Sequence, residues 1–326
     1  MTQPAAKKVS AYWVLIAMVA MITVPAIPIL LTVRRSAFID VSHLNPSPHG
    51  YTVSLLFFIV PIVTIGFWFI PQERIKVSRH SFWTTIALLF PLGAALDFFF
   101  AHSFFIFPDP AATLGISAPA IGGGVPIEEY VFYLSGFVTI LLTYIWLDEY
   151  WLNLYSVPGE SEIRANFDRL LKFHPESLVV CVLLIVAAIL CRRVLAPGVP
   201  GFPGYFTFLV VGALGPSILL FPTAKSVINW RAVSLTMFTM LLTSILWEAT
   251  LAVPYGWWGY QSGQMIGIHI LAWDNLPIEA VVVWLAVTYS TVIVYETMKR
   301  WRSSGKAAIH AFFGKSEESA TIDKAD

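Results

Sequence analysis

Five acidic residues lie within or at the start of long apolar stretches of this sequence. Asp97 and Glu248 lie inside such stretches, and Glu128, Glu129 and Glu279 begin others. A charged side chain inside a bilayer costs about 2.5–3.5 kcal/mol even on the lenient insertion scale, so such a residue is a functional candidate by default. No Lys or Arg lies well inside these stretches to neutralise the acids. We therefore expect one acid of each cluster to hold a proton at neutral pH and to act as a general acid, with its ionised neighbour as base.

The arrangement of these acids occurs twice along the chain. The motif Pro-Ile-Glu at 126–128 recurs at 277–279, and the shift that relates the two copies, which we term the repeat offset, also carries Asp97 onto Glu248. The upstream acid and the motif glutamate are therefore equally far apart in both copies. Other matches at the repeat offset are Pro71 with Pro222 and Tyr144 with Tyr295. Agreement at so many positions predicts an internal repeat.

Each acid also has a simpler interpretation. Proline at the first position of a helix and an acid in its first turn are both favoured, because the helix dipole attracts negative charge there. Asp97 could be a carboxylate satisfied at the membrane edge, and Glu248 could form a hydrogen bond between helices. The repetition of the motif, with a partner acid upstream in each half, favours the functional interpretation.

Aromatic residues are dense around the acids. Electron-rich ring faces stabilise a cation by about 0.5–2 kcal/mol each, and a carbocation benefits as an ammonium does. Most of these rings fit an interfacial aromatic belt equally well. We take Trp247, Trp257 and Trp258 as the candidates for substrate binding.

The elements that must position these residues are membrane-spanning helices. The chain has 326 residues, of which 57% are hydrophobic and 12% charged, and a span needs about 20 mostly apolar residues. We therefore predict an all-α membrane protein of about eight transmembrane helices, arranged as two parallel four-helix repeats. The predicted spans are 11–33, 51–70, 82–100, 126–147, 178–195, 205–221, 231–253 and 276–297.

The predicted halves are residues 1–150 and 176–301. A polar cytoplasmic linker at 151–175 joins them, and a disordered cytoplasmic tail at 302–326 follows. Lys and Arg concentrate in the N-terminus, the C-terminus and the even-numbered loops, so we expect a multi-pass protein, in the cell membrane if prokaryotic, with both termini in the cytoplasm.

Several classes of function are disfavoured by the sequence. The formal net charge is zero and no basic arm carries interleaved aromatics, so we expect no nucleic-acid partner. The run Gly122-Gly123-Gly124 lacks the spacing of a dinucleotide fingerprint. No Asp-rich cluster or paired Cys and His residues indicate a metal. We predict neither a cofactor nor a metal, which leaves acid–base chemistry in an apolar site.

The repeated motif resembles a known family. The stretch Val-Pro-Ile-Glu-Glu-Tyr-Val-Phe-Tyr at 125–133, echoed by Leu-Pro-Ile-Glu-Ala at 276–280, resembles the lycopene cyclase domain, the membrane-integral type of carotenoid cyclase in heterodimeric bacterial enzymes and in fused fungal and archaeal forms. The resemblance extends to the upstream acids and to Gly-Trp-Trp-Gly-Tyr at 256–260. It covers the last two spans of each half and is faint elsewhere.

This resemblance implies a proton-initiated, redox-neutral isomerisation of an isoprenoid end group. A carboxylic acid would protonate the terminal double bond of a polyene taken from the bilayer, a nearby double bond would attack the cation, and a carboxylate would remove a proton. Glu128 and Glu129 match the first motif of the family and Glu279 the second. Asp97 and Glu248 are added from the repeat alone. A homo-oligomer, or a hetero-oligomer with other isoprenoid-pathway enzymes, is compatible with the resemblance.

Two departures from the family keep other functions open. Ala280 replaces the second acid of the second motif, and the family's halves are commonly shorter, near three spans each. A carotenoid hydratase would begin with the same protonation, and a membrane terpene cyclase would act on a shorter polyene. A proton-coupled transporter would also use membrane acids and parallel repeats, but it needs an aqueous route to both faces.

Overall fold

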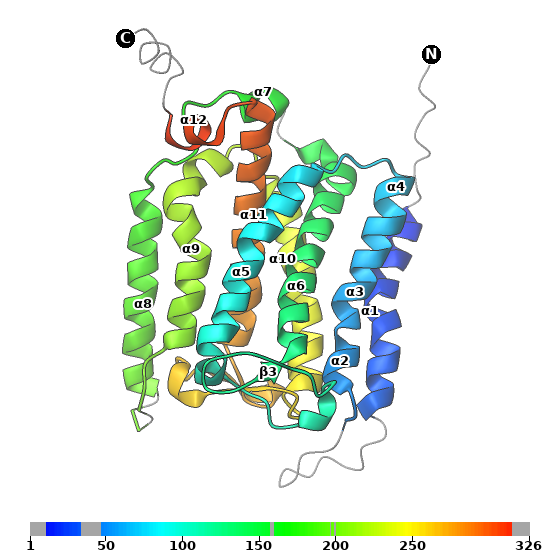
Figure 1. Ribbon diagram of the computed structural model, residues 1–326, viewed down its shortest axis with the longest axis vertical. Coiled ribbons are helices and arrows are strands. Elements are labelled where there is room, and N and C mark those ends of the chain that lie inside the picture. Colours follow the sequence, from blue (N-terminus) through cyan, green and yellow to red (C-terminus); the bar gives the residue numbers. More distant parts are fainter. Residues whose placement is uncertain (1–10, 34–46, 157–159, 196, 199, 315–326) are drawn as a thin grey trace.

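The computed structural model describes residues 11–33, 47–156, 160–195, 197–198 and 200–314, which form a bundle of long helices with a layer of short strands and loops across one end (Figure 1). Seven helical segments are long and apolar enough to cross a membrane, as a multi-pass all-α membrane protein requires. They are Gly50–Gln72, Arg79–Phe104, Ile127–Trp151, Pro175–Leu195, Gly204–Ala224, Trp230–Ala252 and Glu279–Ser304.

Seven of the eight predicted spans are thus confirmed as helices of sufficient length. The remaining one, 11–33, coincides with helix α1 (Ala11–Val33), which is 23 residues long. The first of the seven consists of α2 (Gly50–Ser54), α3 (Leu56–Val63), the π-helical η1 (Thr64–Phe69) and α4 (Ile70–Gln72). The others are built on α5 (Arg79–Phe104), α6 (Ile127–Trp146), α8 (Pro175–Leu195), α9 (Gly204–Ala224), α10 (Trp230–Ser244) and α11 (Glu279–Ser304).

Two of these spans end in π-helical turns, η3 (Leu147–Trp151) after α6 and η5 (Ile245–Ala252) after α10. Such turns widen the helix locally and are frequent at functional sites. Successive spans run in alternating directions, so that α5 and α10 end, and α6 and α11 begin, at the same end of the bundle (Figure 1).

At that end, residues 105–126 and 253–278 form what we term the cap. Its three two-stranded antiparallel sheets pair β1 (Phe105–Ile106) with β4 (Gly259–Tyr260), β2 (Ser117–Ala118) with β3 (Val125–Pro126), and β5 (His269–Ile270) with β6 (Leu276–Pro277). Short 3₁₀ turns at Pro110–Ala112, Ser262–Gln264 and Leu271–Trp273 complete it. The β1–β4 pair joins the two segments of the cap across the bundle end.

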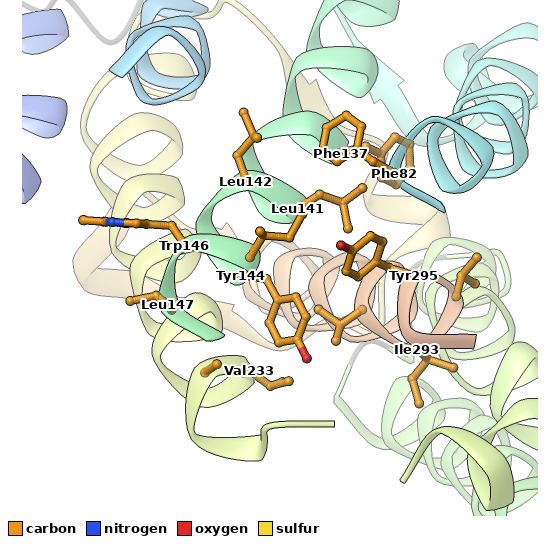
Figure 2. Close-up of a cluster of buried hydrophobic side chains, with 14 of the residues drawn as sticks. Phe82, Phe137, Leu141, Leu142, Tyr144, Trp146, Leu147, Val233, Ile293 and Tyr295 are labelled. Carbon is orange, nitrogen blue, oxygen red and sulfur yellow. The ribbon is translucent and has the colours of Figure 1, made fainter. Parts of the chain in front are cut away.

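Away from the cap, the interior of the bundle is filled by a large apolar cluster (Figure 2). Tyr144 of α6 and Tyr295 of α11 meet at its centre with ring centroids 6.2 Å apart and nearly perpendicular planes, a favourable aromatic geometry. Phe82, Phe137 and Leu141 pack in the same cluster. The aromatic contact of Tyr144 with Tyr295 joins α6 to α11 in the half of the bundle away from the cap.

The prediction that residues 302–326 form a disordered tail is wrong for its first part. Helix α11 continues to Ser304, and α12 (Ala308–Phe313) follows. Ala311 of α12 is fully buried against Phe167 and Leu170 of the predicted linker, because this short segment carries an apolar face that the polar composition of the tail conceals. Residues 315–326 lie outside the described residues. Within the linker, α7 (Glu160–Ala165) packs on α11.

Candidate functional site

A cavity of about 130 Å³ lies inside the bundle next to the cap. Two of the predicted acids, Glu129 of α6 and Glu248 of η5, form part of its wall. The rest of the wall is mainly apolar and rich in aromatic rings from the helices and the cap. These rings are Tyr51, Phe105, Phe107, Phe132, Tyr133, Phe137, Tyr205, Phe208, Trp247, Trp258 and Tyr260.

Glu248 is held by three hydrogen-bond donors. Its Oε1 accepts from the indole of Trp284 at 2.9 Å and from the hydroxyl of Ser244 at 3.2 Å. Its Oε2 accepts from the hydroxyl of Tyr260. The side chain is only 4% exposed. Three convergent donors suit a carboxylate, which can only accept, and they fix its orientation at the cavity wall.

Glu129 and Asp97 lie close enough to interact electrostatically, and each holds a tyrosine hydroxyl. Tyr51 donates to Oε1 of Glu129 at 2.5 Å, and Tyr133 donates to Oδ1 of Asp97 at 3.2 Å. Glu129 interacts in the same way with Glu248. Asp97 is fully buried and does not line the cavity. Tyr133 does line it, and Asp97 lies behind Tyr133. The structure thus brings three of the five predicted acids together.

Glu128 and Glu279 have a different environment. Each is buried at the start of its helix, and neither lines the cavity. Oε1 of Glu128 accepts from the amide of Leu114 at 2.7 Å, and Oε1 of Glu279 accepts from the amide of Ile266 at 2.6 Å. Both partners belong to the cap. The two repeated glutamates therefore fasten the cap to α6 and α11, which is close to the simpler interpretation of the motif.

Two of the three predicted tryptophans line the cavity. Trp247 and Trp258 pack with ring centroids 4.5 Å apart, and Trp258 also contacts Tyr51 at 4.8 Å. Trp257 is fully buried outside the cavity wall, where its indole donates to the hydroxyl of Ser47. Its ring fills the space over Gly50, at which an added Cβ would lie 2.5 Å from a ring carbon.

Three tyrosines of the site were not singled out from the sequence. Tyr133 follows Glu129 by one helical turn, and this i, i+4 spacing was a usable signal that both face the same side. Tyr260 belongs to the Gly-Trp-Trp-Gly-Tyr segment. Tyr51 gave no signal, because only the packing of the second span against α6 brings it to Glu129.

The hydroxyl of Tyr260 lies in the cap, outside the spans. Burial and, to a lesser extent, the neighbouring charge of Glu248 raise the pKa of Tyr260 well above its usual value. The hydroxyl therefore stays protonated throughout the neutral and mildly alkaline range, and it remains a donor to Glu248.

Comparison of the chain with models of known protein families, with curated proteins and with solved structures finds no match. Among the described residues, no three His, Cys, Asp or Glu side chains are grouped so as to hold a metal ion. A functional assignment therefore has to be argued from the geometry of the cavity and its acids.

Proposed function

We propose that this protein is a membrane-embedded cyclase that closes the end group of a carotenoid-like polyene into a ring by proton-initiated, redox-neutral isomerisation. The observation that carries the proposal is the position of Glu129 and Glu248 on the wall of one aromatic cavity, with Asp97 close behind. Carboxyl groups of this kind can serve as acid and base, and the surrounding rings suit a carbocation. The resemblance of the motifs to the lycopene cyclase domain points to the same reaction.

We assign Glu129 as the acid and Glu248 as the base. Glu129 would donate its proton to the terminal double bond, and the cation formed would be attacked by a double bond further along the chain, closing the ring. Glu248, whose three donors suit the ionised form, would remove a proton from the ring to restore a double bond. The proton taken up by Glu248 would return to Glu129 before the next turnover, with Asp97 and Tyr133 close behind Glu129. One proton enters and one leaves, so the product is an isomer of the substrate.

The size of the cavity fits this reaction. An engineered apolar cavity of about 150 Å³ holds a benzene molecule, so a cavity of about 130 Å³ has room for one end group of a polyene at most and excludes the rest of the chain. Trp247 and Trp258 stand against this space. Ring faces stabilise a cation by about 0.5–2 kcal/mol each, so together they lower the barrier to protonation.

We also propose that the two halves are parallel repeats, with both termini in the cytoplasm. Contacts between positions related by the repeat offset support the repeat. Asp97 accepts a hydrogen bond from Tyr133, and at the equivalent positions Glu248 accepts one from Trp284. Glu128 and Glu279 hold the cap in the same way. The strands β3 and β6, which precede them, are also separated by this offset.

An enzyme fits these observations better than a proton-coupled transporter. The cap covers the acids at one end of the bundle. The other end holds the apolar cluster around Tyr144 and Tyr295 (Figure 2) and, beside it, the buried ion pairs of Glu296 with Arg164 and Lys299. Alternating access would have to open both barriers. A hydratase or a cyclase of shorter polyenes would use the same acids, and the product distinguishes them.

The experiment is to express the chain in a bacterium that accumulates lycopene and to analyse the pigments by chromatography and mass spectrometry. A product of unchanged mass with one double bond fewer for each ring closed supports the cyclase. A product heavier by one water would replace it with the hydratase. Unaltered lycopene in membranes that contain the protein would refute the lycopene-cyclase assignment, and shorter polyenes would then be tried.

A further inference from the structure

The cavity that holds the acids is not closed on all sides. Leu92 of α5 and Gly212 of α9 both contribute to its wall, and both also lie on the outside of the bundle, Leu92 with 63% of its surface exposed. The inner part of the same wall is formed by α11, on which both α5 and α9 pack. The cavity therefore reaches the outer surface of the bundle between α5 and α9, which lie side by side in Figure 1.

This opening lies at the depth of lipid tails. Leu92 and Gly212 are near the middle of two helices that are long and apolar enough to cross a membrane. The residues exposed beside them are apolar as well, Leu88 on α5 and Val211 on α9. At the middle of a span the surroundings of the protein are hydrocarbon.

We propose that this side opening, formed by Leu92, Gly93, Phe208 and Gly212, admits the end of a long linear polyene directly from the hydrocarbon core of the bilayer, while the rest of the chain stays between the lipids. The inference rests on the proposed function and adds to it the route and the class of substrate. A polyene is insoluble in water, and a route through lipid spares it the unfavourable transfer of its apolar chain into water.

Gly212 keeps the opening wide. A Cβ built at this position would meet no atom within 4 Å, so the space beside it is empty and available to a chain. At Gly93, on the opposite helix, there is no free space, since a Cβ there would lie 2.8 Å from the ring of Tyr133. Gly93 thus lets α5 approach α6, and Gly212 leaves room for the substrate.

Two consequences for specificity follow. A cavity of about 130 Å³ contacts only the end group, so the enzyme recognises an acyclic end and is indifferent to the length and the far end of the polyene. A polyene with an acyclic group at both ends must leave the cavity after the first cyclisation and enter again with its other end. Conversion of a symmetrical polyene should therefore release a product cyclised at one end before the product cyclised at both.

The test fills the opening without touching the acids. Gly212→Trp places a large ring in the empty space, and Val211→Trp places the same ring one residue away, on the exposed surface outside the cavity wall. Blocking the opening should lower the conversion of lycopene in cells by about tenfold or more, whereas Val211→Trp should leave it within about twofold of wild type. Both are compared at equal amounts of protein in the membrane, and equal conversion by the two variants would refute the route.

A binding measurement keeps this test separate from the proposed function. Gly212→Cys and Val211→Cys are made in a Cys181→Ser, Cys191→Ser background and photolabelled in vesicles with a bilayer-soluble diazirine, whose carbene reacts with a thiol that is not ionised. Lycopene in the vesicles should slow labelling at position 212 and leave position 211 unchanged. If wild type fails to convert lycopene, the function is refuted, while protection at 212 would still support the opening. Equal labelling at both positions would overturn the opening itself.

Discussion

The substitution Glu129→Gln tests which glutamate of the Pro-Ile-Glu-Glu motif is the acid. The amide of Gln can still accept the hydrogen bond from Tyr51 through its oxygen, so the cavity should keep its shape. What is lost is the proton. Since a general acid contributes about 10²–10⁴-fold to a rate, Glu129→Gln should lower conversion by a factor in that range.

Glu128 provides the matched control, one residue away in the same motif. In Glu128→Gln the amide oxygen can keep the bonds from Thr52 and from the amide of Leu114, so conversion should remain close to wild type. Glu128→Ala removes both acceptor contacts at a cost of about 1–3 kcal/mol for each buried donor left unpaired, and should lower the temperature of thermal unfolding in detergent.

The assay is pigment conversion in lycopene-accumulating cells, normalised to the protein in the membrane fraction. The expected order is wild type, then Glu128→Gln, then Glu129→Gln far below. If Glu128→Gln is inactive while folded and Glu129→Gln is active, the acid has been misassigned and the cavity is not where protonation occurs. If both are inactive but folded, the assignment of Glu128 as a purely structural residue is refuted.

Three further changes have expected outcomes. Tyr260→Phe removes a donor from Glu248 and should slow conversion by about tenfold, to the same extent from about pH 6 to 9, because the raised pKa keeps the wild-type hydroxyl protonated over that range. Gly93→Ala should push the Tyr133 ring away from Asp97 and reduce conversion. In a Tyr133→Phe background, which lacks the hydroxyl that bonds Asp97, the further change Gly93→Ala should not reduce conversion again. Washing membranes with EDTA should leave conversion unchanged, and a loss restored by added metal would contradict chemistry by carboxylic acids alone.

The helices were predictable from the sequence because apolar runs of about 20 residues have few alternatives in a bilayer. The sequence could not predict which of two neighbouring residues faces the cavity. Successive residues on a helix point about 100° apart, so Glu128 and Glu129 face different surroundings, and only the packing of α6 decides which one meets the cavity. Trp257 and Trp258 also differ, because the chain bends at Trp257 and no sequence period tells which of the two rings turns towards the cavity.

The repeat pointed to site residues that composition alone could not identify. Adding Asp97 and Glu248 to the candidate site depended on the repeat offset, and the structure places both beside Glu129. The π-helical turn that carries Glu248 had no signal in the sequence, since its residues are as apolar as those of the preceding turns. The sequence likewise did not predict helix α12 in the tail, because α12 packs on Phe167 and Leu170, which lie far from it in the chain.

Positions related by the repeat offset also line a second cavity. A second cavity, of about 220 Å³, lies between α1, α3, α6 and α10. Its lining contains the equivalents of positions lining the first cavity: Phe57 for Phe208, Pro61 for Gly212, Thr139 for Ser290, Met240 for Leu89 and Thr243 for Leu92.

Some lining positions of the two cavities thus correspond, but the second cavity extends towards Trp146 and Leu147, away from the cap, and of the acids only Glu129 has no acidic counterpart at the offset. The position equivalent to Glu129 is Ala280, which is buried in an apolar cluster with Ala249 and Leu276. Since Asp97 and Glu248 come from different halves yet flank one Glu129, a single acid present in one copy of the motif is enough to make the arrangement one-sided.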